Sequence, residues 1–142
     1  MSKGDTFEND LLKLIFNAVG IANLAIDATS SPLADLYVSL HSADPGEAGN
    51  QQTNEVGYTG YQRVAVARTS GGWTVTNNSV SPVANIDFGP CTNGTVTVTH
   101  FAIGTAPSGT GKILYSGTVT PNIPVSVGVT PRLTTDSVVT ED

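Results

Sequence analysis

The side chains that could support catalysis in this chain are few and scattered. Nucleophilic catalysis needs a hydroxyl or thiol beside a positioned base, and the imidazole bases available are His41 and His100. Neither histidine lies in a nucleophile signature such as G-x-S-x-G, so we expect each to make local hydrogen bonds in a strand. Cys91, the single cysteine, follows a Gly-Pro turn and is predicted to be a small semi-buried apolar residue. The sequence therefore predicts that the protein is not an enzyme.

A long polar segment, residues 42–57, carries three carboxylates, those of Asp44, Glu47 and Glu55. Paired carboxylates can perform acid–base catalysis, and oxygen ligands on a flexible loop can bind Ca²⁺. The spacing of the three carboxylates does not match an EF-hand loop, so we expect no metal and no cofactor. The alternative function for this loop is that of a small glycan hydrolase, with Asp44 or Glu47 as a catalytic acid or base. Loops this long in small domains are usually functional or ordered by a partner. We therefore predict that Asp44, Glu47, Asn50 and Glu55 bind a partner.

The charge balance argues against a nucleic-acid partner. The 142-residue chain has 6 Lys and Arg against 12 Asp and Glu, for a net charge of −6. Nucleic-acid binding depends on clustered cations that neutralise phosphates, and here the basic residues are scattered. Charged residues make up 13% of the chain, which is about half the usual share. A weakly charged exterior suits packing against other subunits, because few charges must be desolvated at the contact.

The apolar run over residues 11–26 is not expected to enter a membrane. It is interrupted by Lys13, Asn17 and Asn23, and it is too short and polar to span a bilayer. It also lacks the cleavage site of a secretory signal. We expect a soluble protein made in a cytoplasm, stabilised by packing or assembly because one cysteine allows no intrachain disulfide.

Residues 6 to about 28 carry a helical pattern, either as one helix or as two shorter helices divided at Gly20, which weakens the middle. Apolar residues recur at spacings of three and four and form one stripe on a helix, and further apolar residues widen that stripe past half the circumference. Such a helix packs either on the sheet of its own subunit or on a neighbouring protein. We predict that it docks on a neighbour through Phe7, Leu11, Leu14 and Ile15.

After Pro32 the chain has the pattern of a β protein, in which short alternating runs are separated by turn signals. Seven or eight short strands at regular intervals predict an antiparallel β-sandwich, with a jelly-roll-like topology as first choice and an immunoglobulin-like one as the alternative. Two regions are expected, an N-terminal helical segment over 1–31 and a sandwich domain over 32–142. The predicted strands are Asp35–His41, Gln62–Thr69, Gly72–Thr76, Asn85–Phe88, Gly94–Thr105, Lys112–Val119, Pro124–Val129 and a weaker one near Leu133–Val139.

Trp73 follows a Gly-Gly turn and begins an alternating strand. This placement favours a core role, because aromatic side chains bury large areas. A platform for a host sugar, formed by Trp73 and a nearby Tyr, is the alternative.

Three stretches of the sequence carry a resemblance to a known family. They are LYVSLHSADPGEAGNQQTNEVGYTGYQRVAVAR from Leu36, GGWTV from Gly71 and THFAIGTAPSGTGKILYSG from Thr99. They resemble a family of small tailed-bacteriophage virion structural proteins, which includes tail-fibre or minor tail proteins and similar capsid decoration (cement) proteins. The resemblance runs from about Leu36 to the C-terminus.

This resemblance implies a structural protein of the virion, made in the cytoplasm of the bacterial host. We predict a capsid decoration protein that binds and stabilises the head shell, with the major capsid protein or other virion proteins as partners. A homo-oligomer is expected, and a trimer would suit the three-fold positions of a shell. The alternative is a tail or tail-fibre component that contacts the host surface.

Overall fold

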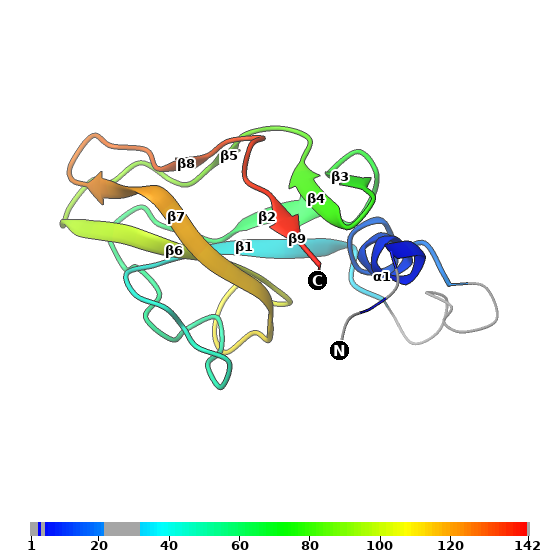
Figure 1. Ribbon diagram of the computed structural model, residues 1–142. Helices are drawn as coiled ribbons and strands as arrows, with labels where there is room; N and C mark the ends of the chain where they lie inside the picture. The colour runs from blue at the N-terminus through cyan, green and yellow to red at the C-terminus, as the bar shows by residue number, and fades with distance from the viewer. Residues whose placement is uncertain (1–2, 4, 22–31, 142) are drawn as a thin grey trace. The chain divides into compact units, whose positions relative to one another are not determined.

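The computed structural model describes residues 3, 5–21 and 32–141, which form one helix and nine strands (Figure 1). All the strand pairings with a defined register are antiparallel, and the fold is mainly β with one N-terminal helix, as predicted. The elements are α1 (Asp5–Asn17), β1 (Asp35–His41), β2 (Val64–Ala67), β3 (Trp73–Thr76), β4 (Ser79–Pro82), β5 (Ile86–Asp87), β6 (Val96–Gly104), β7 (Ile113–Val125), β8 (Arg132–Leu133) and β9 (Val139–Thr140).

The chain divides into two compact units, each built from segments that are distant in the sequence. The first unit comprises Met1–Asp35, Val66–Asn85 and Thr134–Asp142, and the second comprises Leu36–Ala65 and Ile86–Leu133. The domain boundary predicted between residues 31 and 32 falls at the end of residues 22–31, which lie outside the described residues. That boundary therefore stays a prediction.

The first unit contains α1 and a three-stranded sheet with the order β3-β4-β9. Its core is aromatic and aliphatic because α1 and the sheet bury their apolar sides, including Leu12, Phe16, Trp73 and Val80. The rings of Phe16 and Trp73 pack edge to face, with their centroids 4.9 Å apart. This geometry suits the ring quadrupoles and confirms the predicted core role of Trp73.

Helix α1 ends at Asn17, so the prediction of one helix continuing to about residue 28 is wrong over residues 18–21. Ala18 has a φ of 56° and the amide of Val19 donates to the carbonyl of Lys13 (3.1 Å), as in a helix C-cap. The guanidinium of Arg68 then donates to two carbonyls of the last turn, those of Ile15 (2.6 Å) and Leu14 (2.8 Å). Residues 22–28 of the prediction lie outside the described part of the chain.

The second unit contains the four-stranded sheet β2-β1-β6-β7, to which β2 contributes its first half, and the pair β5-β8. In the sheet register, Leu40 of β1 is paired with Phe101 of β6, and Phe101 is paired with Gly117 of β7. Figure 1 shows β6 and β7 side by side over their length. Strand β1 lies between β2 and β6, so neighbouring strands flank both of its edges. It is buried over most of its length. The core of this unit consists of Leu36, Val38, Leu40, Val56, Tyr58, Ile86, Phe88, Cys91, Val98, Ala102, Ile103, Val119, Val125 and Leu133.

The strand prediction has three larger errors, apart from shifts of a few residues at the ends of other strands. The sequence reasoning missed β4, which follows the Asn77-Asn78 turn directly and pairs with β3 through Val80 and Val75. Its sequence, SVSP, has one strong strand former and ends in proline, so no alternation is visible. Of the strand expected over Pro124–Val129, only Pro124 and Val125 are extended, and they form the end of the long strand β7. The strand expected near Leu133–Val139 is replaced by β8 and β9. The jelly-roll topology stays a prediction.

Candidate partner-binding surfaces

The first candidate surface is the side of helix α1 that its own unit leaves partly open. Glu8, Leu12 and Phe16 form the buried face of the helix. At 100° per residue, Phe7, Leu11 and Leu14 lie about 100–160° around the helix from the centre of that face, and Ile15 lies about 60° from it. Phe7 is 40% exposed; Leu11, Leu14 and Ile15 are half-buried. The helix thus packs on its own unit and keeps the predicted docking stripe partly accessible.

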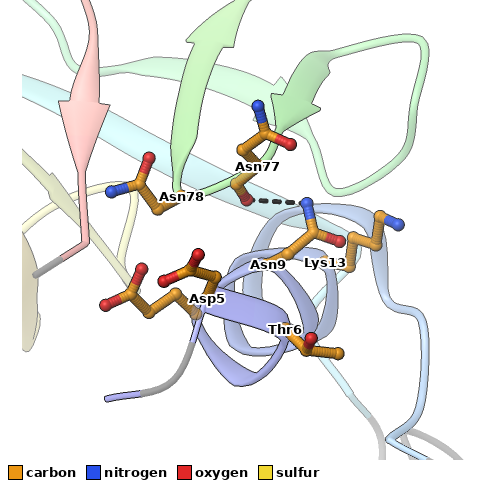
Figure 2. A pocket seen from close by; sticks show the side chains of 7 residues that line it. Asp5, Thr6, Asn9, Lys13, Asn77 and Asn78 are labelled. Carbon is orange, nitrogen blue, oxygen red and sulfur yellow. Dashed lines mark hydrogen bonds between the residues drawn. The ribbon is translucent and has the colours of Figure 1, made fainter. Parts of the chain in front are cut away.

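A polar pocket of about 740 Å³ adjoins the start of this helix. The side chain of Asn9 donates to the backbone carbonyl of Asn77 (2.6 Å), which ties α1 to the turn between β3 and β4 (Figure 2). In the view of Figure 2, Asp5 and Asn78 lie on one side of this bond and Lys13 on the other. The pocket is therefore lined by polar and charged side chains, and its walls are held together by an internal hydrogen bond.

The second candidate surface is the loop over residues 42–57, where the structure separates the predicted partner-binding residues into two pairs. Asp44 and Glu47 are exposed and line a groove of about 460 Å³ together with the first residues of β7. Asn50 and Glu55 are half-buried and bonded within the protein. The structure thus leaves Asp44 and Glu47 available to a partner.

Glu55 is held by a buried ion pair. Its carboxylate accepts two bonds from the Arg63 guanidinium, at 2.7 and 2.8 Å, and one from the Tyr61 hydroxyl at 2.9 Å. Burial raises the pKa of Tyr61, so its hydroxyl stays protonated and donates. Because both oxygens of Glu55 already accept bonds from Arg63, the carboxylate is unsuited to the Ca²⁺ site considered for this loop.

Arg63 and Gln51 fasten the loop to the turn that precedes β7. Arg63 also donates to the carbonyls of Ala106 (2.9 Å) and Gly109 (2.6 Å). The fully buried Gln51 side chain donates to the carbonyl of Tyr37 (3.0 Å) and accepts from the amide of Ala106 (3.0 Å). Two glycines face it, and a Cβ on either Gly104 or Gly111 would collide with the Gln51 amide. These anchors give the loop a fixed shape.

The sequence placed Tyr61 at the core or its edge and Arg63 in a strand with Arg68, but it did not indicate that Arg63, Gln51 or Tyr61 holds this loop. Arg63 lies eight positions after Glu55 in the sequence. Because Glu55 is in a loop, this spacing does not predict that the two side chains meet. The glycines at 104 and 111 were also visible, yet only the fold shows that Gln51 occupies the space beside them. Contacts of this kind cannot be found from local pattern.

The histidines make the local hydrogen bonds that the sequence predicts. His41 Nε2 lies 2.9 Å from Ser39 Oγ and its Nδ1 lies 2.8 Å from the carbonyl oxygen of Thr53. Burial lowers the pKa of His41, although the Thr53 bond and the Glu55 carboxylate oppose this shift. Both Ser39 and His41 are fully buried. In His100, Nδ1 lies 2.8 Å from Thr99 Oγ1.

Two further residues from the sequence analysis belong to the cores. Trp73 is 2% exposed and presents no free ring face, so the idea that its ring forms a sugar platform is wrong. Cys91 is 1% exposed and so more deeply buried than the semi-buried position predicted for it, and its thiol lies within hydrogen-bonding distance of the carbonyls of Asn93 and Gly94.

Within residues 3, 5–21 and 32–141, no group of three or more His, Cys, Asp or Glu side chains is placed to hold a metal ion. The helix found in this part of the chain falls short of the length and apolar character needed to cross a membrane.

The family model described as podophage GP4 fiber I protein gp80 matches residues 3–141, which spans both compact units. No curated protein matches the chain.

Proposed function

We propose that this chain, which belongs to the podophage GP4 fiber I protein gp80 family, is a fibre component of the phage tail that contacts the host surface. Membership in this family makes the chain a structural protein of the phage virion. The match over residues 3–141 is the observation that carries the proposal, because it covers nearly the whole of the chain.

The family description supports the tail-fibre alternative better than the capsid decoration role that was the first choice from the sequence. Decoration of the head, binding to the major capsid protein and a trimer suited to three-fold shell positions stay predictions. Both roles would use the same physical mechanism, in which apolar and weakly polar surface is buried in many repeated contacts. Modest individual contacts give high avidity when the geometry allows them to form together.

Two surfaces are proposed to make these contacts. The helix stripe of Phe7, Leu11, Leu14 and Ile15 would bury apolar area that is partly wet in the free chain, at about 25 cal/mol per Å². The exposed carboxylates of Asp44 and Glu47 would contribute polar and charged contacts at the loop. Chemical turnover has no part in this proposal.

Immunogold electron microscopy of intact virions tests the fibre assignment. An antibody against the chain should label the tail, and purified chain should compete with virions for adsorption to host cells. Labelling spread over the head would support decoration and would refute the fibre role.

The helix stripe can be tested separately through incorporation into particles. Phe7→Asp should reduce the amount of the chain in purified virions, while Val127→Asp is the matched control because it changes another exposed apolar residue, one in the second unit. Equal incorporation of both variants would show that the stripe is not a docking surface.

A further inference from the structure

Strand β7 is one edge of the four-stranded sheet, and this edge is unusually unprotected. Over Ser116–Thr118 it pairs with β6 on one side, and no other backbone hydrogen bond is found for these residues among those described. A free edge presents unpaired N–H and C=O groups to any extended chain, so proteins usually shorten such edges, charge them or add proline.

The two edges of this sheet differ in that respect. The opposite edge, β2, has only four residues and is flanked by Arg63 and Arg68. Strand β7 has 13 residues, none of them charged, and its first proline is Pro121. Its first half therefore lacks the devices that discourage strand addition.

The first part of β7 also forms one wall of the groove described above. The groove is lined on that side by Lys112–Ser116 and on the other by the loop residues Asp44, Gly46, Glu47 and Gly49. The loop wall is rigid, because the amide of Gly46 donates to Asp44 Oδ1 (2.9 Å) and the side chain of Asn54 donates to the carbonyl of Asp44 (2.9 Å). The unpaired edge residues Ser116–Thr118 thus begin at Ser116, where this preformed groove ends.

The charges of the groove select among possible occupants. Asp44 and Glu47 are both exposed, and Lys112 offsets one of these two negative charges. If the β7 edges of two copies of this acidic chain met, each copy, with a net charge of −6, would place its own Asp44 and Glu47 at the shared interface. Like charges brought together in this way are destabilising, whereas a basic segment is attracted.

We propose that an extended, lysine- or arginine-bearing segment of another virion protein adds as a strand to β7 at Ser116–Thr118 and continues into this groove. Backbone hydrogen bonds to β7 provide the affinity, as in other cases of strand addition. Basic side chains of the segment reach Asp44 and Glu47 and fix its register. The choice of virion proteins as partners rests on the proposed fibre role; the geometry of the groove does not.

The test uses an array of overlapping 12-residue peptides that spans the other structural proteins of the virion and this chain itself. The labelled full-length chain should bind a small set of basic peptides taken from other proteins. For the best peptide, two synthetic forms are N-methylated at alternate positions. Strand addition uses one edge of the peptide, so one form should bind at least tenfold more weakly and the other should bind almost unchanged.

Two protein variants test the role of charge. Asp44→Asn combined with Glu47→Gln should weaken peptide binding about tenfold, the loss of two surface ion pairs. The matched control, Asp5→Asn combined with Asp136→Asn, removes two exposed carboxylates of the first unit and should leave binding unchanged. Circular dichroism checks that both variants are folded.

Each other outcome would overturn the inference. These outcomes are that no peptide binds, that both methylated forms bind alike, that the loop variant and its control behave alike, or that peptides from this chain's own β7 bind best. The last result would make a second copy the occupant. None of these results changes where immunogold labels the virion, so the fibre role is judged independently.

Discussion

The ion pair between Glu55 and Arg63 provides the most quantitative test of how the 42–57 loop is held. The Arg63 side chain is 2% exposed and the Glu55 side chain 14%. In Glu55→Gln the guanidinium keeps the carbonyls of Ala106 and Gly109 but loses its counter-charge, and one of the two oxygens that accept from it is replaced by an NH2 donor. Breaking a buried pair by removing one partner costs about 3–5 kcal/mol. The remaining carbonyl partners place the expected loss at the lower end, about 3 kcal/mol.

Urea unfolding followed by circular dichroism measures this loss. With a denaturant slope of about 1.5 kcal/mol per molar urea, the midpoint should fall by about 2 M. Asp87→Asn is the matched control, because Asp87 and Arg132 form a bidentate pair that is exposed on both sides. Its midpoint should not move measurably, since exposed ion pairs are screened by solvent.

A double-mutant cycle with Arg63→Met separates the pair from the rest of the network. The double variant should be more stable than the sum of the single losses predicts, because it leaves no buried charge without a partner. A loss below about 1 kcal/mol for Glu55→Gln, the range of exposed pairs, would refute the view that this ion pair anchors the loop.

Three further predictions concern stability. Arg68→Met should speed amide exchange at Val19 and lower the stability of the first unit, because the carbonyls of Leu14 and Ile15 lose their donor; unchanged exchange would show that the helix end does not need Arg68. Trp73→Ala should cost about 3–5 kcal/mol, as for other buried aromatic residues, because the ring is 2% exposed and packs on Phe16; a loss below about 1 kcal/mol in urea unfolding would contradict this core role. The free energy of unfolding should fall as the pH drops below about 6.5, because the unfolded chain then protonates His41 while burial keeps the folded histidine neutral. One proton gives a slope of at most about 1.4 kcal/mol per pH unit. Urea midpoints between pH 7.5 and 5.5 should show this slope in the wild type and in His100→Gln but not in His41→Gln, and an equal slope in all three would assign it to other groups.

The sequence predicted the elements with strong periodicity and missed those fixed by distant contacts. Alternation located β1 and β6, and the spacing of apolar residues located α1, because these patterns follow from geometry within one element. The end of α1 depends on Arg68, which lies 53 positions after Ile15, so no local signal placed it. Strand β4 exists because β3 and β9 pair with it, although its own residues have weak strand preference.

The sequence predicted where the candidate surfaces lie but not how their residues are bonded. The long polar loop and the wide apolar stripe were visible as composition, and the structure places Phe7, Asp44 and Glu47 where a partner can reach them. The structural role of Glu55 was not visible, because an acid in a polar loop looks the same whether it faces solvent or a buried arginine. Charge alone could not separate these two cases; the fold did so by bringing Arg63 to Glu55.

A cryo-electron microscopy reconstruction of the intact virion, including its tail, tests the central claim most directly. The account predicts density for this β-rich chain in a fibre of the tail, with its strands resolved and in contact with neighbouring proteins. Density for the chain on the lattice of the head, or no density for it in the particle, would contradict the account.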